Sequence, residues 1–120
     1  MSLRSLHDWL GWVVVGANAA VGAWALGAQW LLWLRRRPLW WCVGIAQALL
    51  FVQAIVGVAL YNEVGGEGPR LHMFYGFLTI VSVAVLYGYR GTLGDRRWTL
   101  YGLGSLFIAG LSLQAIANAT

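Results

Sequence analysis

The two histidines of the chain, His7 and His72, occupy matching places in the sequence. Each follows a leucine, precedes a glycine (Gly11 or Gly76) by four residues, and stands near the start of a long apolar run. Residues four apart share a helix face, so each glycine leaves space beside its histidine for a flat macrocycle or a close helix contact. Paired imidazoles in an apolar surround suit heme iron, so the pattern predicts one heme b with His7 and His72 as axial ligands.

Further polar or small residues lie on the faces that carry the histidines. In the first apolar run, residues at heptad spacing predict a seam that faces the interior of a helical bundle. This seam consists of His7, Gly11, Asn18, Gly22 and Gln29. Gln53 in the second run and Gln114 in the fourth are expected beside the cofactor. The alternative is that these amides hydrogen-bond between helices, as polar residues in membrane bundles do.

Two arginines, Arg4 and Arg70, come shortly before the histidines. Their guanidinium groups could pair with the two propionates of a heme. The alternatives are that the arginines anchor at lipid headgroups and that each histidine is an interfacial residue at a helix end. A zinc site is disfavoured, because two histidines supply too few ligands and Asp8 is the one carboxylate near them.

Four apolar runs must position these residues. The chain has 120 residues, 60% hydrophobic and only 10% charged, whereas an average soluble domain is about 25% charged. The runs cover residues 9–34, 38–61, 71–89 and 98–117, approximately. Each reaches the roughly 20 residues that a helix needs to cross a bilayer. Because the connections are short, we expect an all-α membrane protein: one domain, 1–120, forming a four-transmembrane-helix up-down-up-down bundle.

The chain also repeats itself, residues 6–57 matching residues 71–118. The matching segments are Leu6–Trp12 with Leu71–Phe77, Arg35–Arg36 with Arg96–Arg97, and Gln53–Ile55 with Gln114–Ile116. The pattern predicts a tandem duplicated helical hairpin whose copies are parallel in the membrane. Both histidines then lie at one end of the bundle, on the diagonal first and third helices, whose axes are roughly 12–15 Å apart given neighbours 8–10 Å apart.

The arginines predict the orientation. Six of them lie in the loops after the first and third runs: Arg35, Arg36, Arg37, Arg90, Arg96 and Arg97. The positive-inside rule places these loops in the cytoplasm and both termini outside. The arginines cluster at the ends of apolar runs, which favours the lipid bilayer, and no nucleic acid, as the partner. We expect an integral protein of a bacterial or archaeal cell membrane.

The motif Leu-His-x-x-x-Gly at a helix start, followed by Gln53-x-x-x-Gly57 in the next helix, resembles one four-helix half of the heme A synthase family. The resemblance implies heme binding by His7 and His72, with Gln53 and Gly57 in the helix that follows. The catalytic half of that family carries Glu-x-x-His-Arg, whereas here Pro69 holds the glutamate position. What carries over is therefore heme binding rather than oxidation of the heme methyl group.

We therefore expect a small b-type membrane cytochrome or heme-binding subunit that serves electron transfer or heme handling. Its partners would be a larger respiratory or heme-handling membrane complex or further copies of itself. One alternative is a compact heme A synthase-like oxidoreductase, so the enzyme question stays open, with a non-enzyme favoured. Another is a cofactor-free accessory or scaffold subunit of a larger membrane complex.

Overall fold

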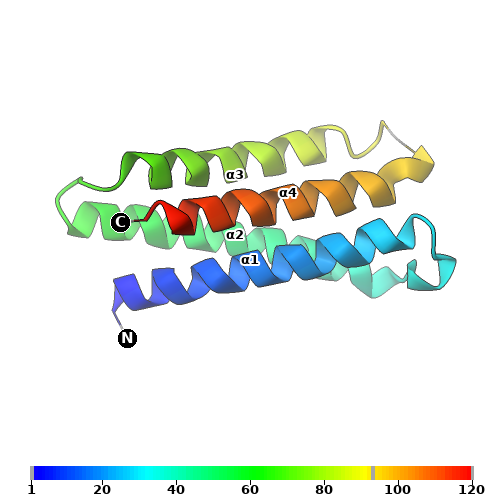
Figure 1. Cartoon of the computed structure of the whole chain (residues 1–120), viewed down its shortest axis with the longest axis horizontal. Coiled ribbons are helices and arrows are strands. Elements are labelled where there is room, and N and C mark those ends of the chain that lie inside the picture. Colours follow the sequence, from blue (N-terminus) through cyan, green and yellow to red (C-terminus); the bar gives the residue numbers. More distant parts are fainter. Residues whose placement is uncertain (1, 93, 120) are drawn as a thin grey trace.

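The computed structural model describes residues 2–92 and 94–119, which form four α-helices and two short 3-10 turns (Figure 1). The α-helices are α1 (Leu3–Ala28), α2 (Arg37–Glu63), α3 (Arg70–Gly88) and α4 (Arg97–Ala117), and the turns are η1 (Leu32–Leu34) and η2 (Gly94–Arg96). Each helical span is long and apolar enough to cross a membrane. The predicted all-α four-helix architecture is confirmed, and it is consistent with an integral membrane protein.

The first helix is displaced from the expected range of 9–34. It begins at Leu3, where the Ser2 hydroxyl caps the helix by accepting a hydrogen bond from the Ser5 amide at 3.1 Å. It ends at Ala28, whose carbonyl accepts a hydrogen bond from Arg35 Nε at 2.7 Å. A guanidinium that takes up the last carbonyls favours a helix end. The polypeptide then turns through η1 before α2 begins.

The helices are arranged so that α1 packs against both α2 and α4, and α4 also packs against α3. Figure 1 shows α4 between α1 and α3, with α2 behind. The pair α2 and α3 meets least of the neighbouring pairs. The first and third helices are therefore the diagonal pair, as the order of short connections predicts. Both termini and the α2–α3 loop lie at one end, the terminal end, and the other end is the arginine-rich end.

The closest helix contact joins α1 and α4 through two glycines. A Cβ on Gly22 would lie 2.9 Å from the backbone nitrogen of Leu106, and one on Gly102 would lie 2.6 Å from that of Leu26. Small residues let helix backbones approach in membranes, where close packing drives association. The interior seam predicted for the first helix is confirmed at Gly22 and at Asn18, since both are buried.

Buried amides link the helices in the middle of the bundle. Asn18 Nδ2 donates to the carbonyls of Val14, at 3.0 Å, and of Ala46 in α2, at 3.4 Å. Gln47 Nε2 donates to the hydroxyl of Ser105 in α4 at 3.4 Å. These bonds support the packing interpretation for the amides at this depth.

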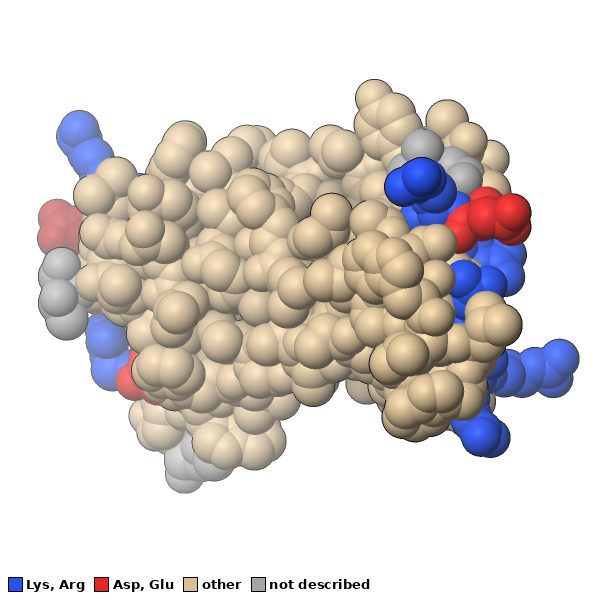
Figure 2. Space-filling view, turned by 45° about the vertical axis from the view of Figure 1, so that its right-hand side comes forward, with Lys and Arg blue, Asp and Glu red and all other residues tan. Residues whose placement is uncertain are grey.

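Aromatic and arginine side chains gather at the arginine-rich end. The rings of Trp40 and Trp98 have centroids 4.7 Å apart, and the Arg97 guanidinium lies 5.0 Å from the Trp98 ring centroid. Such cation–π contacts favour an arginine held at the rim of an apolar core. Figure 2 shows charged side chains at the two ends of the molecule and an uncharged belt between them. That distribution suits a protein surrounded by lipid.

We predict that Gly102→Ala destabilises the bundle, because the new methyl group would collide with the α1 backbone. Overpacking of this kind costs about 1–3 kcal/mol. The control is Gly110→Ala on the same helix, where nothing lies within 4 Å of the added Cβ. Reversible unfolding in mixed micelles, followed by circular dichroism, should show a loss for Gly102→Ala alone. Equal stabilities of the two variants would contradict the close α1–α4 contact.

Candidate functional site

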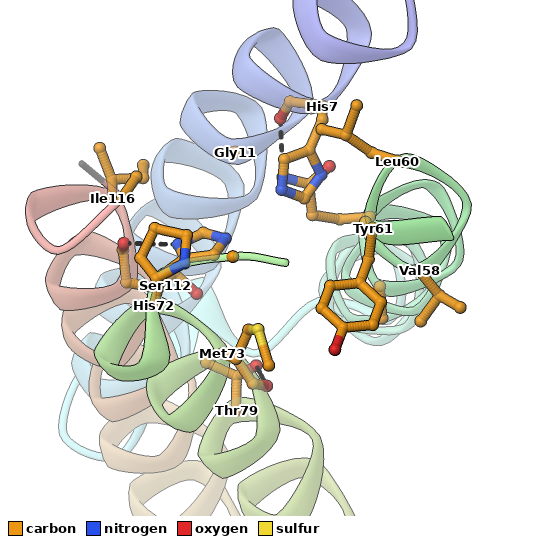
Figure 3. A pocket seen from close by; sticks show the side chains of 18 of the residues that line it. His7, Gly11, Val58, Leu60, Tyr61, His72, Met73, Thr79, Ser112 and Ile116 are labelled. Carbon is orange, nitrogen blue, oxygen red and sulfur yellow. Dashed lines mark hydrogen bonds between the residues drawn. The ribbon is translucent and has the colours of Figure 1, made fainter. Parts of the chain in front are cut away.

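A cavity of about 670 Å³ lies at the terminal end, and all four helices and the α2–α3 loop contribute to its wall (Figure 3). Its volume falls within the roughly 300–1,000 Å³ typical of cofactor and small-molecule sites. Six of the residues expected at the site line this cavity: Arg4, His7, Gly11, Gln53, His72 and Gly76. The structure thus brings together side chains that are distant in the sequence.

The two histidines meet across the cavity, as Figure 3 shows. His7 projects from α1 and His72 from α3, and their ring centroids lie 5.8 Å apart with planes inclined by 82°. Both residues are partly buried. The meeting follows from the fold, because α1 and α3 are diagonal and each histidine stands near the start of its helix at the same end of the bundle.

His72 is oriented by a backbone carbonyl of α4. Its Nδ1 lies 2.7 Å from the carbonyl oxygen of Ala115. A carbonyl oxygen only accepts, so in this bond Nδ1 carries the hydrogen and donates it. In the neutral ring Nε2 is then left with its lone pair free, which is the form of imidazole that binds a metal.

His7 is oriented by α2. A Cβ on Gly57 would lie 2.9 Å from Cε1 of His7, so a larger residue at that position would require the ring to move. Gln53 Nε2 donates to the backbone carbonyl of His7 at 2.7 Å. Within the described residues, Nδ1 of His7 and Oε1 of Gln53 are buried and have no hydrogen-bond partner. In the described part of the chain, the His7 ring is therefore positioned by packing against Gly57 and not by a hydrogen bond of its own. Its ring nitrogens remain available to bind a ligand.

The two glycines that follow the histidines differ in their surroundings. A Cβ on Gly11 would lie 3.3 Å from Gln53 Nε2 and 3.5 Å from Cδ1 of Ile116, so Gly11 serves a close helix contact. Nothing lies within 4 Å of a Cβ on Gly76, which faces open space in the cavity wall. The close helix contact that the spacing allowed is thus found at Gly11, and open space is found at Gly76.

Two expected residues do not line the cavity. Gln114 is exposed, because the buried face of α4 runs through Ser112 and Ala115 and one helical step turns the next side chain by about 100°. Arg70 is also exposed and lies outside the cavity wall, whereas Arg4 is part of it. The equivalence between Gln53 and Gln114 therefore holds for the sequence and not for the side-chain positions.

Other residues of the wall were not expected from the sequence. Ser112 contributes a buried hydroxyl that has no hydrogen-bond partner in the described part of the chain, and Met73 lies near the cavity mouth. A signal existed for Ser112, since it stands seven residues after the buried Ser105 on the same face of the helix.

The separation of the two histidine rings can be compared with that of two imidazoles that share a metal. With metal–nitrogen bonds of about 2.0–2.1 Å, two opposed imidazole rings have centroids roughly 6.4 Å apart. The 5.8 Å separation of the His7 and His72 rings is close to that value. Nearly perpendicular planes are compatible with such a pair, because each plane needs only to contain its own metal–nitrogen bond. Two protein ligands suit a metal that brings its remaining ligands with it, as iron in a porphyrin does.

We predict that neutral His72 carries its proton on Nδ1, because that nitrogen donates to the Ala115 carbonyl. Solid-state NMR of protein containing ¹⁵N-labelled histidine should show a protonated Nδ1 and an unprotonated Nε2 for His72 in lipid bilayers. His72 can be assigned by the loss of its signals in His72→Ala, with His7→Ala as the matched variant. A neutral His72 protonated on Nε2 would contradict the geometry.

Comparisons of the chain with protein-family models, with curated proteins and with solved structures give no match. The resemblance to heme A synthase therefore stays a prediction from short motifs.

Proposed function

We propose that the protein binds one heme b in the cavity at the terminal end, with His7 and His72 as axial ligands, and serves as a small membrane cytochrome or heme-carrying subunit. The observation that carries this proposal is the pair of imidazoles facing each other from diagonal helices, with ring centroids 5.8 Å apart. A bound heme would supply one-electron transfer at its iron. The protein would supply the ligands, their orientation and an apolar surround.

Three contacts of the chain support these roles. The Ala115 carbonyl holds the His72 ring with Nε2 free, and partners of this kind tune the basicity of a metal-binding imidazole. Gly57 gives the His7 ring its place against α2. Gly76 leaves a part of the α3 wall flat and open, which suits the face of a macrocycle.

The charged residues of the cavity wall carry both signs, Arg4 with Asp8 and Glu67. Arg4 belongs to the cavity wall at the terminal end and can pair with a propionate. Arg70 is exposed and outside the wall, so the second propionate would extend toward water. The apolar edge of the macrocycle would then point toward the middle of the bundle.

We predict that His7→Ala and His72→Ala have nearly the same effect on purified protein. With both ligands present, the ferric iron should be low-spin and should not bind carbon monoxide when reduced. Loss of either ligand should lower heme retention by about tenfold or more, or give a high-spin form that binds carbon monoxide. Visible absorption spectra with and without carbon monoxide measure both outcomes.

The matched control for the histidine variants is Gln114→Ala, because Gln114 is exposed and lies outside the cavity wall. That variant should keep the wild-type spectrum. An unchanged low-spin spectrum in one histidine variant would refute a shared site. A colourless wild-type protein, purified from cells supplied with heme, would favour the scaffold alternative instead. Conversion of heme O to heme A would favour the oxidase.

We also propose that the arginine-rich end faces the cytoplasm and that the cavity lies near the outer leaflet. The proposal is supported by the greater number of arginines at that end, which Figure 2 shows. In short loops this bias sets the orientation of a membrane protein. A heme in this position would exchange electrons with partners at the outer surface.

We predict that, in a background with Cys42 replaced by alanine, Glu63→Cys reacts with an impermeant thiol reagent on intact cells and Thr92→Cys does not. Both positions are exposed, Glu63 at the terminal end and Thr92 at the arginine-rich end. As the control, both variants should be labelled after the cells are lysed, which shows that both thiols can react. Labelling of Thr92→Cys alone on intact cells would reverse the orientation.

A further inference from the structure

Three of the four seams between neighbouring helices are closed at the depth of the cavity. The α1–α2 seam is closed by the hydrogen bond from Gln53 to the His7 carbonyl. The α3–α4 seam is closed by the hydrogen bond between His72 and the Ala115 carbonyl. The α1–α4 seam is closed by a close approach at Gly11, where a Cβ would lie 3.5 Å from the Ile116 side chain. A ligand cannot pass these three seams without breaking packed contacts.

The α2–α3 seam differs. Helices α2 and α3 pack least against each other, although both line the cavity, and within the described residues no hydrogen bond joins them. Apolar side chains of both helices line the cavity and remain largely exposed, Val58 of α2 being 61% exposed and Phe77 of α3 65% exposed. The α2–α3 loop contributes Gly68 and Pro69 to the wall and covers part of the end that faces water. Among the four seams, the cavity wall is therefore least closed between α2 and α3.

The sequence contains a reason for this asymmetry. In the predicted repeat, Gly22 of α1 is equivalent to Tyr87 of α3, and Gly102 of α4 is equivalent to Trp41 of α2. The two glycines let the α1 and α4 backbones touch, whereas the equivalent positions of α3 and α2 hold two large aromatic residues. Trp41 is 71% exposed rather than packed against α3. The α2–α3 seam cannot close in the way that its counterpart does.

We propose that the cavity receives its ligand from the hydrocarbon phase of the bilayer, sideways through the α2–α3 seam. The ligand class that this route selects is a flat and largely apolar molecule that dissolves in lipid. The identification of that molecule as heme rests on the proposed function, whereas the route does not. Apolar side chains such as Val58 and Phe77 at the seam lower the cost of bringing such a molecule from lipid into the cavity, because they need no desolvation of a polar group.

The first test measures the rate of heme binding by heme-free protein in vesicles whose lipid already contains heme. Val58→Trp and Phe77→Trp narrow the seam from its two sides. Each should slow binding by about tenfold, which corresponds to about 1.4 kcal/mol on the barrier. The matched control is Phe107→Trp on the lipid-exposed face of α4, 59% exposed and outside the cavity wall. Wild-type rates in both seam variants would overturn the route.

The second test needs no heme. A nitroxide is attached at Gly76→Cys, in a background with Cys42 replaced by alanine, because nothing lies within 4 Å of that Cβ position. Collisions with oxygen, which dissolves in lipid, are compared with collisions with a water-soluble nickel chelate. The label should behave like one at Phe107 and unlike one at the exposed Glu63. Preference for the nickel chelate would overturn the route even if heme binds.

The two tests separate the two proposals. If the wild-type protein binds no heme but the label at Gly76 meets oxygen and not nickel, the heme proposal fails and the lipid route stands for another apolar ligand. If heme binds to both seam variants at the wild-type rate and the label at Gly76 meets nickel, the route fails and the heme proposal stands.

Discussion

The distance between α1 and α4 is fixed by two glycines, and the shape of the bundle follows from that distance. At Gly22 and Gly102 any side chain would meet the backbone of the opposite helix. In lipid, helices are held by packing and interhelical hydrogen bonds, and both weaken when backbones move apart. Because α1 and α4 form the centre of the arrangement, α2 and α3 flank them and meet each other least.

The cavity is a consequence of this unequal packing. Each histidine has its support on a neighbouring helix, His72 on the Ala115 carbonyl of α4 and His7 on Gly57 of α2. The supports belong to different sides of the bundle, so the rings are presented toward each other and not toward a shared wall. A tighter α2–α3 contact would remove the space, and a looser α1–α4 contact would separate the supports.

The helices, the interior face of α1 and the histidine pair could be predicted from the sequence, because they depend on local periodicity and on the repeat. The end of α1 could not, since it depends on the Arg35 guanidinium reaching the Ala28 carbonyl. The exposure of Gln114 could not be predicted either. The repeat makes it equivalent to Gln53, but the rotation of a helix about its axis is set by packing against its neighbours. Packing of this kind has no signature in a single helix.

Three buried polar groups of the cavity wall have no hydrogen-bond partner within the described residues. These groups are His7 Nδ1, Gln53 Oε1 and the Ser112 hydroxyl. Each such group costs about 1–3 kcal/mol. In the proposed complex, His7 would coordinate through Nε2, which leaves the proton on Nδ1 and makes the N–H group a stronger donor. Gln53, whose amide nitrogen already donates to the His7 carbonyl, has a free acceptor in Oε1. Ligand binding would then offset part of the cost and stabilise the folded bundle, which couples occupancy of the site to the stability of the fold.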